Sequence, residues 1–141
     1  MTLFEFHHRV LFQHCDPAGM VFYPRYFEMI NACVETWFEQ DLKVPFKQLH
    51  LQLGLSVPTA STQTKFHAPS HLGDQLVFQL QLLKLGNTSL QLSINALCEG
   101  QLRLRNETTI VLIEQNNGRP TPWQRHKCFS GLIHSHTHTH E

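Results

Sequence analysis

The spacing of apolar side chains changes near residue 24. From Pro24 to Gln40, large apolar residues recur at steps of three and four, while charged and amide side chains take the opposite side. The apolar positions are Tyr26, Phe27, Ile30, Val34, Trp37 and Phe38. This spacing predicts an amphipathic helix of about four turns that ends near Gln40. Pro24 suits the first helical position, because its missing N–H costs nothing there.

Elsewhere the chain shows the two-residue period of strands. Residues 2–12 predict a first strand, and residues 45–53 predict a short helical turn that Gly54 closes. Beyond this turn, apolar and polar residues alternate, which predicts strands over residues 55–67, 76–82, 90–98 and 102–114. The turn signals that follow within this part of the chain are Gly86–Asn87, Glu99–Gly100 and Asn117–Gly118.

The order of these elements is one strand, one long helix and then about four antiparallel strands. Such a sheet has one apolar face, and the helix is the element available to cover it. We therefore predict a single α+β domain over residues 1–126. The remaining residues, 127–141, end in "HSHTHTHE". Spaced histidines can chelate a transition metal, but we expect this segment to be an unstructured tail.

Composition narrows the class of protein. The chain has 141 residues, of which 41% are hydrophobic and 16% charged, as expected for one globular domain. Eleven basic residues balance eleven acidic ones, so no net field draws the chain to nucleic acid or an anionic membrane. No apolar run approaches the roughly 20 residues that span a bilayer, which favours the cytoplasm. The four cysteines form no C-x-x-C pair, so we predict neither a disulfide framework nor a zinc site; Cys33 and Cys98 are predicted to be buried.

An acid precedes the helix in the stretch "HCDPAGMVFYPRYF", residues 14–27. Residues 16–19, Asp-Pro-Ala-Gly, fit a type I turn, and that alone explains the four residues. The cap position of the helix falls on Tyr23, whose hydroxyl is too far out to bond the first-turn amides. The amides of Tyr23, Arg25 and Tyr26 then lack a side-chain partner. Together with the helix dipole, they suit a partial negative charge on a ligand.

Asp16, seven residues upstream of that cap position, can fold back towards the start of the helix. The hydrolysis of an activated acyl group requires at least an acid or base and, opposite it, donors that stabilise the oxyanion. In the alternative interpretation, Asp16 itself caps the helix across the loop. The residues alone leave both interpretations open.

The same stretch resembles the active-site segment of the 4-hydroxybenzoyl-CoA thioesterase family, whose pattern is D-P-A-G-x-V-x-Y-P-x-Y. The matching residues are Asp16, Pro17, Ala18, Gly19, Val21, Tyr23, Pro24 and Tyr26. The resemblance implies the hotdog fold, an antiparallel sheet wrapped around one long central helix. It also implies an acyl-CoA thioesterase in which Asp16 is nucleophile or general base and the Tyr23 backbone N–H polarises the thioester carbonyl. Homodimers or homotetramers, with active sites at subunit interfaces, are implied as well.

Two departures from the wider superfamily concern the helix. Relatives carry a histidine where this chain has Tyr23, and some other branches place a catalytic glutamate on the helix. Glu28 and Glu35 fall on the polar side of the helix here, so we interpret them as solvated charges. His14 lies beside Asp16 in the sequence, but alternation along a strand end would point the two side chains apart.

A thioester is already activated, so the implied reaction requires no metal and no organic cofactor. The implied substrate is an acyl-CoA, whose acyl group we expect beside Phe22 and Tyr23. The candidate substrate-binding residues are Gly19, Phe22, Pro24, Tyr26, Lys65 and His67. The candidate cations for the CoA phosphates are Lys65, His67, Lys84, Arg103 and Arg105.

Two alternatives belong to other classes of function. One is a non-catalytic hotdog module that binds acyl groups or only scaffolds an assembly. The other is a cysteine hydrolase that uses Cys15 with His14, although adjacent residues rarely face each other and no orienting acid is evident.

Overall fold

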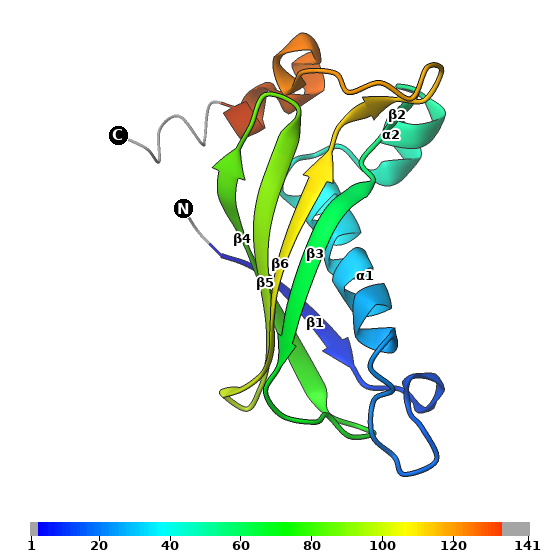
Figure 1. Ribbon diagram of the computed structural model, residues 1–141, viewed down its shortest axis with the longest axis vertical. Coiled ribbons are helices and arrows are strands. Elements are labelled where there is room, and N and C mark those ends of the chain that lie inside the picture. The colour runs from blue at the N-terminus through cyan, green and yellow to red at the C-terminus, as the bar shows by residue number, and fades with distance from the viewer. Residues whose placement is uncertain (1–2, 134–141) are drawn as a thin grey trace.

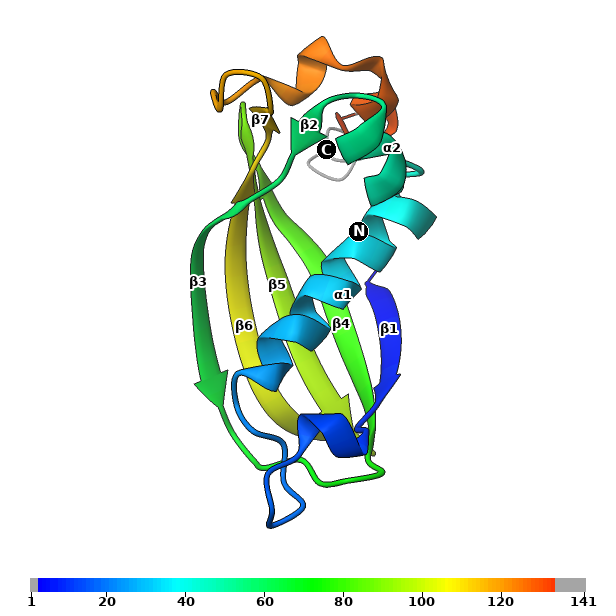
Figure 2. The same ribbon diagram turned by 90° about the vertical axis from the view of Figure 1, so that its right-hand side faces the viewer.

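A curved antiparallel sheet wraps the long helix α1 (Arg25–Gln40), which crosses its concave face (Figure 1, Figure 2). The computed structural model describes residues 3–133. The strands are β1 (Phe4–Arg9), β2 (Leu55–Ser56), β3 (Thr59–Phe66), β4 (Gln75–Leu85), β5 (Ser89–Cys98), β6 (Gln101–Val111) and β7 (Ile113–Glu114). The other helical elements are α2 (Phe46–Leu51) and the 3-10 turns η1 (Phe12–His14), η2 (Trp123–Arg125) and η3 (Lys127–Phe129). The main sheet has five strands in the order β1-β4-β5-β6-β3, and β2 pairs with β7 separately.

The core lies between α1 and the concave face of the sheet. The helix buries Tyr26, Met29, Ile30, Cys33, Val34, Trp37 and Phe38. The central strands bury alternate residues against it, namely Leu76, Phe78, Leu80, Leu82, Leu90, Leu92, Ile94, Ala96, Cys98, Leu104 and Ile110. The α+β architecture and the burial of Cys33 and Cys98 are therefore as predicted, and burial raises the pKa of the Cys33 thiol to about 12. No helix within residues 3–133 is long and apolar enough to cross a membrane.

Several boundaries within the sheet differ from the sequence prediction. The stretch predicted over residues 55–67 divides at Val57–Pro58, so β2 leaves the main sheet and pairs with β7. The β4–β5 turn is closed by a hydrogen bond from the Gly86 amide to the Ser89 carbonyl (2.8 Å), one residue beyond the predicted pair. The β5–β6 turn does lie at Glu99–Gly100, where both residues have positive φ (50° and 79°), as a two-residue hairpin turn requires.

The packed part of the chain continues past residue 126, where the sequence predicts the domain to end. Phe129 and Leu132 are buried. The ring of Phe129 meets those of Trp123 and Phe38 edge-on, at centroid distances of 4.9 Å and 6.2 Å. An isolated apolar residue in a short turn has no period to follow, so the sequence pattern misses this contact. The histidine-rich segment 134–141 lies outside the described residues.

β3 is an edge strand of the main sheet. It pairs with β6 on one side, and on its other side no strand of residues 3–133 lies next to it. Seven of its eight residues are exposed, and Thr64 is half-buried. A long exposed edge presents unpaired backbone N–H and C=O groups, so it is a template for a further strand.

Candidate active site

Asp16 lies in a tight turn upstream of α1. Its carbonyl accepts a hydrogen bond from the Gly19 amide (3.0 Å), and the φ of Gly19 is 80°, a value that glycine adopts without strain. The turn predicted for residues 16–19 is thus present. Oδ1 of the Asp16 carboxylate accepts hydrogen bonds from the amides of Ala18 (2.9 Å) and Met20 (3.2 Å). Oδ2 has no hydrogen-bond partner among residues 3–133.

The helix itself begins at Arg25, one residue later than predicted, with Pro24 as its N-cap. No side chain caps it. The interpretation of Asp16 as a cap across the loop is therefore wrong. The structural role of Asp16 is confined to its own turn, where Oδ1 holds two amides.

The backbone amides at the start of α1 are not all free. The Arg25 amide donates to the Phe22 carbonyl (2.8 Å), and the Tyr26 amide donates to the Tyr23 carbonyl (3.1 Å). These two amides lack a side-chain partner as predicted, but their backbone bonds correct the expectation that they are available to a ligand. The Tyr23 amide has no acceptor among the described residues. One donor thus remains at the positive end of the helix dipole.

A second loop, residues 67–74, holds the Asp16 turn in place. The Ser70 carbonyl accepts a hydrogen bond from the Val21 amide (2.9 Å), and the Gly19 carbonyl accepts one from the Leu72 amide (2.9 Å). These two bonds lie downstream of Asp16, on the segment that leads into α1. The position of Asp16 therefore depends on the position of this second loop.

Arg103 on β6 ties the second loop to the sheet. Its Nη1 donates to the Pro69 carbonyl (2.9 Å), Ser70 Oγ (3.1 Å) and Asp74 Oδ2 (2.8 Å). Hydrogen bonds from the His71 amide and then from Arg103 lower the pKa of the Asp74 carboxyl. The Arg103 side chain is only 11% exposed. Arg103, a predicted candidate for a CoA phosphate, is thus engaged by acceptors inside the protein.

His14 is buried at the end of η1, where its Nδ1 accepts a hydrogen bond from the Leu11 amide (2.9 Å). Desolvation by burial, with the charge of nearby His8, lowers the pKa of His14. The thiol of Cys15 donates to the Leu11 carbonyl (3.6 Å), and no hydrogen bond within residues 3–133 joins it to the His14 ring. This arrangement does not support the cysteine hydrolase alternative, which needs a base in contact with the thiol.

Three exposed aromatic side chains gather at the start of α1. Phe22, Tyr23 and Phe66 are 51%, 60% and 46% exposed. The Tyr23 ring lies 5.7 Å from Phe22 and 6.2 Å from Phe66. Tyr26, a predicted substrate-binding residue, is buried and lies 5.7 Å from Phe66. Phe66 is absent from the sequence-based candidates. The two-residue period of β3 places it on the same face as half-buried Thr64, and this is the one signal in the sequence that points to it.

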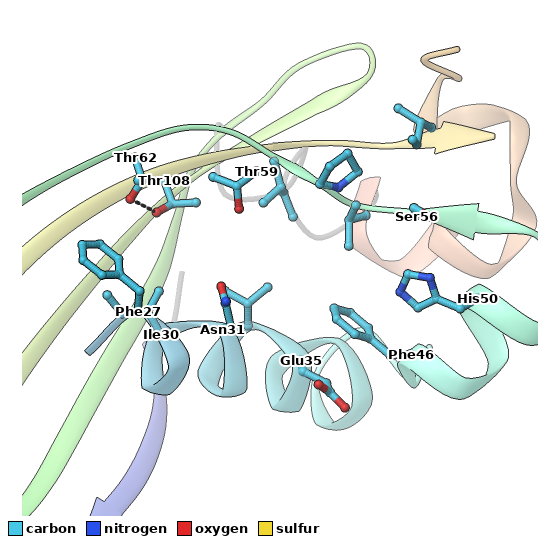
Figure 3. A pocket seen from close by; sticks show the side chains of 15 residues that line it. Phe27, Ile30, Asn31, Glu35, Phe46, His50, Ser56, Thr59, Thr62 and Thr108 are labelled. Carbon is cyan, nitrogen blue, oxygen red and sulfur yellow. Dashed lines mark hydrogen bonds between the residues drawn. The ribbon is translucent and has the colours of Figure 1, made fainter. Parts of the chain in front are cut away.

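A groove of about 710 Å³ lies between α1 and the strands β3 and β6 (Figure 3). Its lining residues are Phe27, Ile30, Asn31, Val34, Glu35, Phe46, His50, Ser56, Val57, Pro58, Thr59, Thr62, Thr108, Ile110 and Ile113. Figure 3 shows the Asn31 side chain pointing across towards Thr59, whereas the Glu35 carboxylate points away from the strands. The groove begins at Phe27, about one helical turn beyond Tyr23. Its volume and its mostly apolar walls are typical of small-molecule sites.

The remaining candidates lie at different distances from this region. Gly19, Phe22 and Pro24 belong to the turn and to the entry of α1. Lys65 is opposite Arg105 in the register of β3 and β6, on the face of the sheet away from α1. His67 is exposed just after β3, where its amide donates to the Arg103 carbonyl (2.8 Å). The substrate-binding roles of all these residues stay predictions.

An antiparallel sheet wrapped around one central helix defines the hotdog class of α+β domains. Solved structures confirm this predicted fold. A gentisyl-coenzyme A thioesterase matches with a TM-score of 0.77 at 22% identity, covering 92% of this chain and 98% of that one. A Staphylococcus aureus protein in complex with CoA matches with a TM-score of 0.86 at 19% identity, covering 96% of this chain and 85% of that one.

The sequence relationships are more specific than the fold. The family model of the thioesterase-like superfamily matches residues 10–127, and the chain belongs to this superfamily. A 1,4-dihydroxy-2-naphthoyl-CoA hydrolase from Synechocystis sp. is 27% identical over 139 residues, covering 91% of this chain and 96% of that protein. The resemblance to the thioesterase family and the expected class of thioester hydrolase are thus confirmed at the level of the family.

Proposed function

We propose that this protein hydrolyses an acyl-CoA thioester to a free acid and CoA, with Asp16 as nucleophile or general base. The observation that carries the proposal is the Tyr23 amide, which lies at the entry of α1 without an acceptor among the described residues. A carbonyl oxygen that accepts this N–H also gains the favourable end of the helix dipole. The segment that carries Asp16 leads directly into this position.

Two groups of the chain suffice for the reaction. The thioester carbonyl oxygen accepts the Tyr23 N–H, and its carbon is attacked by Asp16 Oδ2 or by a water that Oδ2 deprotonates. The tetrahedral oxyanion then collapses, the C–S bond breaks, and CoA leaves as a thiolate that takes up a proton. In the first route, water hydrolyses the acyl anhydride on Asp16. One lost oxyanion donor costs about 3–4 kcal/mol in a well-studied protease.

The acyl group that we propose is a hydroxylated aromatic acid. Two similar proteins are named for dihydroxylated aromatic acyl groups, 1,4-dihydroxy-2-naphthoyl and gentisyl. The groove beside α1 has room for such a ring, and Phe27 and Phe46 give it aromatic walls. Its Phe27 end lies close in sequence to Tyr23, so an acyl group held by the Tyr23 amide can extend into it.

We also propose that the protein forms a homodimer, or a homotetramer built from such dimers, through the edge strand β3. The support is the exposure of this strand on both faces and its single neighbour within residues 3–133. A second copy of β3 would satisfy the unpaired backbone groups. We expect sedimentation at micromolar concentration to give a dimer or a tetramer. A monomer that hydrolyses thioesters would contradict this assembly.

The activity is tested with the purified full chain and a panel of acetyl-, isovaleryl-, palmitoyl-, benzoyl- and hydroxybenzoyl-CoA, by following the release of free thiol. We expect the highest kcat/KM with a hydroxybenzoyl-CoA. Protein carrying Asp16→Asn, purified in the same way, controls for contaminating thioesterases. The non-catalytic hotdog module predicts that no member of the panel releases thiol above this control.

A further inference from the structure

A set of side-chain hydrogen bonds lies on the inner face of β6 and β3. Asn106 and Thr108 are buried, with 1% and 5% of their surface exposed. Asn106 Nδ2 donates to Thr62 Oγ1 (2.9 Å) and to Thr64 Oγ1 (2.8 Å), while its Oδ1 accepts from the Thr108 hydroxyl (2.7 Å). The hydroxyl oxygens of Thr62 and Thr108 are 2.9 Å apart.

These contacts determine where each hydroxyl proton lies. A threonine hydroxyl has a single proton, and Thr108 gives it to Asn106, so Thr108 must accept in its contact with Thr62. Thr62 therefore donates to Thr108. Thr64 accepts from Asn106, and its own hydroxyl proton has no acceptor among residues 3–133. One donor in the set is thus unpaired.

Reversing the Asn106 amide makes the set worse. Oδ1 would then accept from Thr62 and Thr64, but Nδ2 would have Thr108 as its single acceptor. One N–H of a buried amide would stay unpaired, and an unpaired buried donor is unfavourable. The observed orientation is therefore preferred, because it leaves the unpaired donor on half-buried Thr64.

Thr64 does not line the groove where we propose that the acyl group binds, but it neighbours the lining residue Thr62 on the same face of β3. Thr62, Thr64 and Phe66 alternate along one face of β3, at steps of about 7 Å. Thr62 lines the groove, and Phe66 contacts the rings of Tyr23 and Tyr26. Thr64 is therefore placed between the groove and the entry of α1.

We infer that the Thr64 hydroxyl is a specificity-determining donor that binds an acceptor oxygen on the ring of the acyl group. The inference rests on the proposed function. A hydrocarbon acyl group that displaces water from this space leaves the Thr64 donor without a partner, which penalises that substrate. A ring with a phenolic or keto oxygen restores the partner, so the site favours oxygenated aromatic acids over benzoate-like ones.

The test compares Thr64→Val and Thr64→Ser on benzoyl-CoA and on the 2-, 3- and 4-hydroxybenzoyl isomers. Valine keeps the size of threonine without the hydroxyl, whereas serine keeps the hydroxyl. We expect Thr64→Val to lower the ratio of kcat/KM for the preferred hydroxybenzoyl-CoA over benzoyl-CoA by about fivefold to tenfold. Thr64→Ser should keep this ratio within about twofold. Thr109→Val, on the opposite face of β6, is the matched control and should leave the ratio unchanged.

The outcomes separate this inference from the proposed function. Because the ratio does not depend on the folded fraction, lower stability of Thr64→Val does not obscure it. An unchanged ratio in an active Thr64→Val enzyme overturns the inference alone. A parent without thiol release refutes the proposed function, and calorimetry then decides the inference: the Kd advantage of hydroxybenzoate over benzoate must be lost in Thr64→Val. If Thr64→Val is a monomer while the parent is a dimer, the Thr64 hydroxyl donates to the second copy of the chain and not to the substrate. That result would also overturn the inference.

Discussion

Nη1 of Arg103 lies 2.8 Å from Oδ2 of Asp74. The same nitrogen also donates to Pro69 and Ser70, which belong, like Asp74, to the loop that is hydrogen-bonded to the Asp16 turn. The side chains of Arg103 and Asp74 are 11% and 26% exposed, so water screens this ion pair only weakly. The pair therefore links β6 to the candidate active site.

We expect Arg103→Ala to lower the free energy of unfolding by about 2–4 kcal/mol, because it leaves a partly buried carboxylate without its cation. The same change should lower kcat, since the loop that supports the Asp16 turn loses its attachment. Urea unfolding and thiol release measure the two effects. Arg105→Ala, an exposed arginine on the same strand, is the control and should stay within about 0.5 kcal/mol of the parent. Parental stability in Arg103→Ala would show that the loop is held by its backbone bonds alone.

The Asp16→Asn variant tests whether Asp16 takes part in the reaction or only stabilises its turn. Asparagine retains an Oδ1 acceptor for the amides of Ala18 and Met20 but removes the charge, the nucleophile and the base. We expect kcat to fall by about 100-fold or more with little change in KM, while the free energy of unfolding changes by less than about 1 kcal/mol. Asp41→Asn, at the exposed end of α1, is the matched control. The reverse pattern, a loss of about 1–2 kcal/mol in stability with parental kcat, would reduce Asp16 to a turn former.

The lowered pKa of His14 makes stability depend on pH. The pKa of His14 is lower in the folded protein than in the unfolded chain, where it is about 6.5. As the pH falls below about 6.5, the unfolded chain takes up a proton that the folded protein does not, so the free energy of unfolding decreases. This decrease ends once the pH is below the pKa of the folded state. His14→Asn keeps an acceptor for the Leu11 amide without titrating. We expect its unfolding free energy to fall less between about pH 7 and pH 5 than that of the parent. Gln13→Asn, at an exposed position of the same turn that carries no titratable group, is the matched control and should keep the parental slope. If His14→Asn has the parental slope as well, the pH dependence comes from other residues.

Phe129 tests where the domain ends. Because its ring is buried against Trp123 and Phe38, Phe129→Ala should lower the free energy of unfolding by about 3–5 kcal/mol. The exposed neighbour Ser130 provides the control, and Ser130→Ala should be nearly neutral in the same urea titration. A Phe129→Ala protein as stable as the parent would mean that the core closes before residue 127.

The periodic and local parts of the fold are predictable from the sequence. The start of α1 is predictable within one residue, because its apolar face keeps one period over sixteen residues. The turn at residues 16–19 is predictable because Asp, Pro and Gly each favour their own position in it. The candidate acid is found in the same way, since its place before an uncapped helix is a local feature.

Partners that are distant along the chain are not predictable in this way. Arg103 looks like one of several strand cations, and nothing local indicates acceptors that lie 29 to 34 residues earlier. The groove is missed for the same reason, because Phe27 and Ile110 line one groove only when α1 lies against the sheet. The amides of Arg25 and Tyr26 are predicted to be free, but they donate to backbone carbonyls in a turn. No particular side-chain type indicates such a turn, so the sequence does not predict these bonds.

The two oxygens of the Asp16 carboxylate lie in different environments. Oδ1 is held by two amides of its own turn, whereas Oδ2 has no partner among the described residues. Any rotation about the Cβ–Cγ bond short of a half-turn, which only exchanges the two equivalent oxygens, would break both hydrogen bonds. One oxygen therefore keeps its free direction before any substrate arrives. The rotational entropy of this carboxylate is consequently lost when the chain folds, and none of it has to be lost again at each turnover.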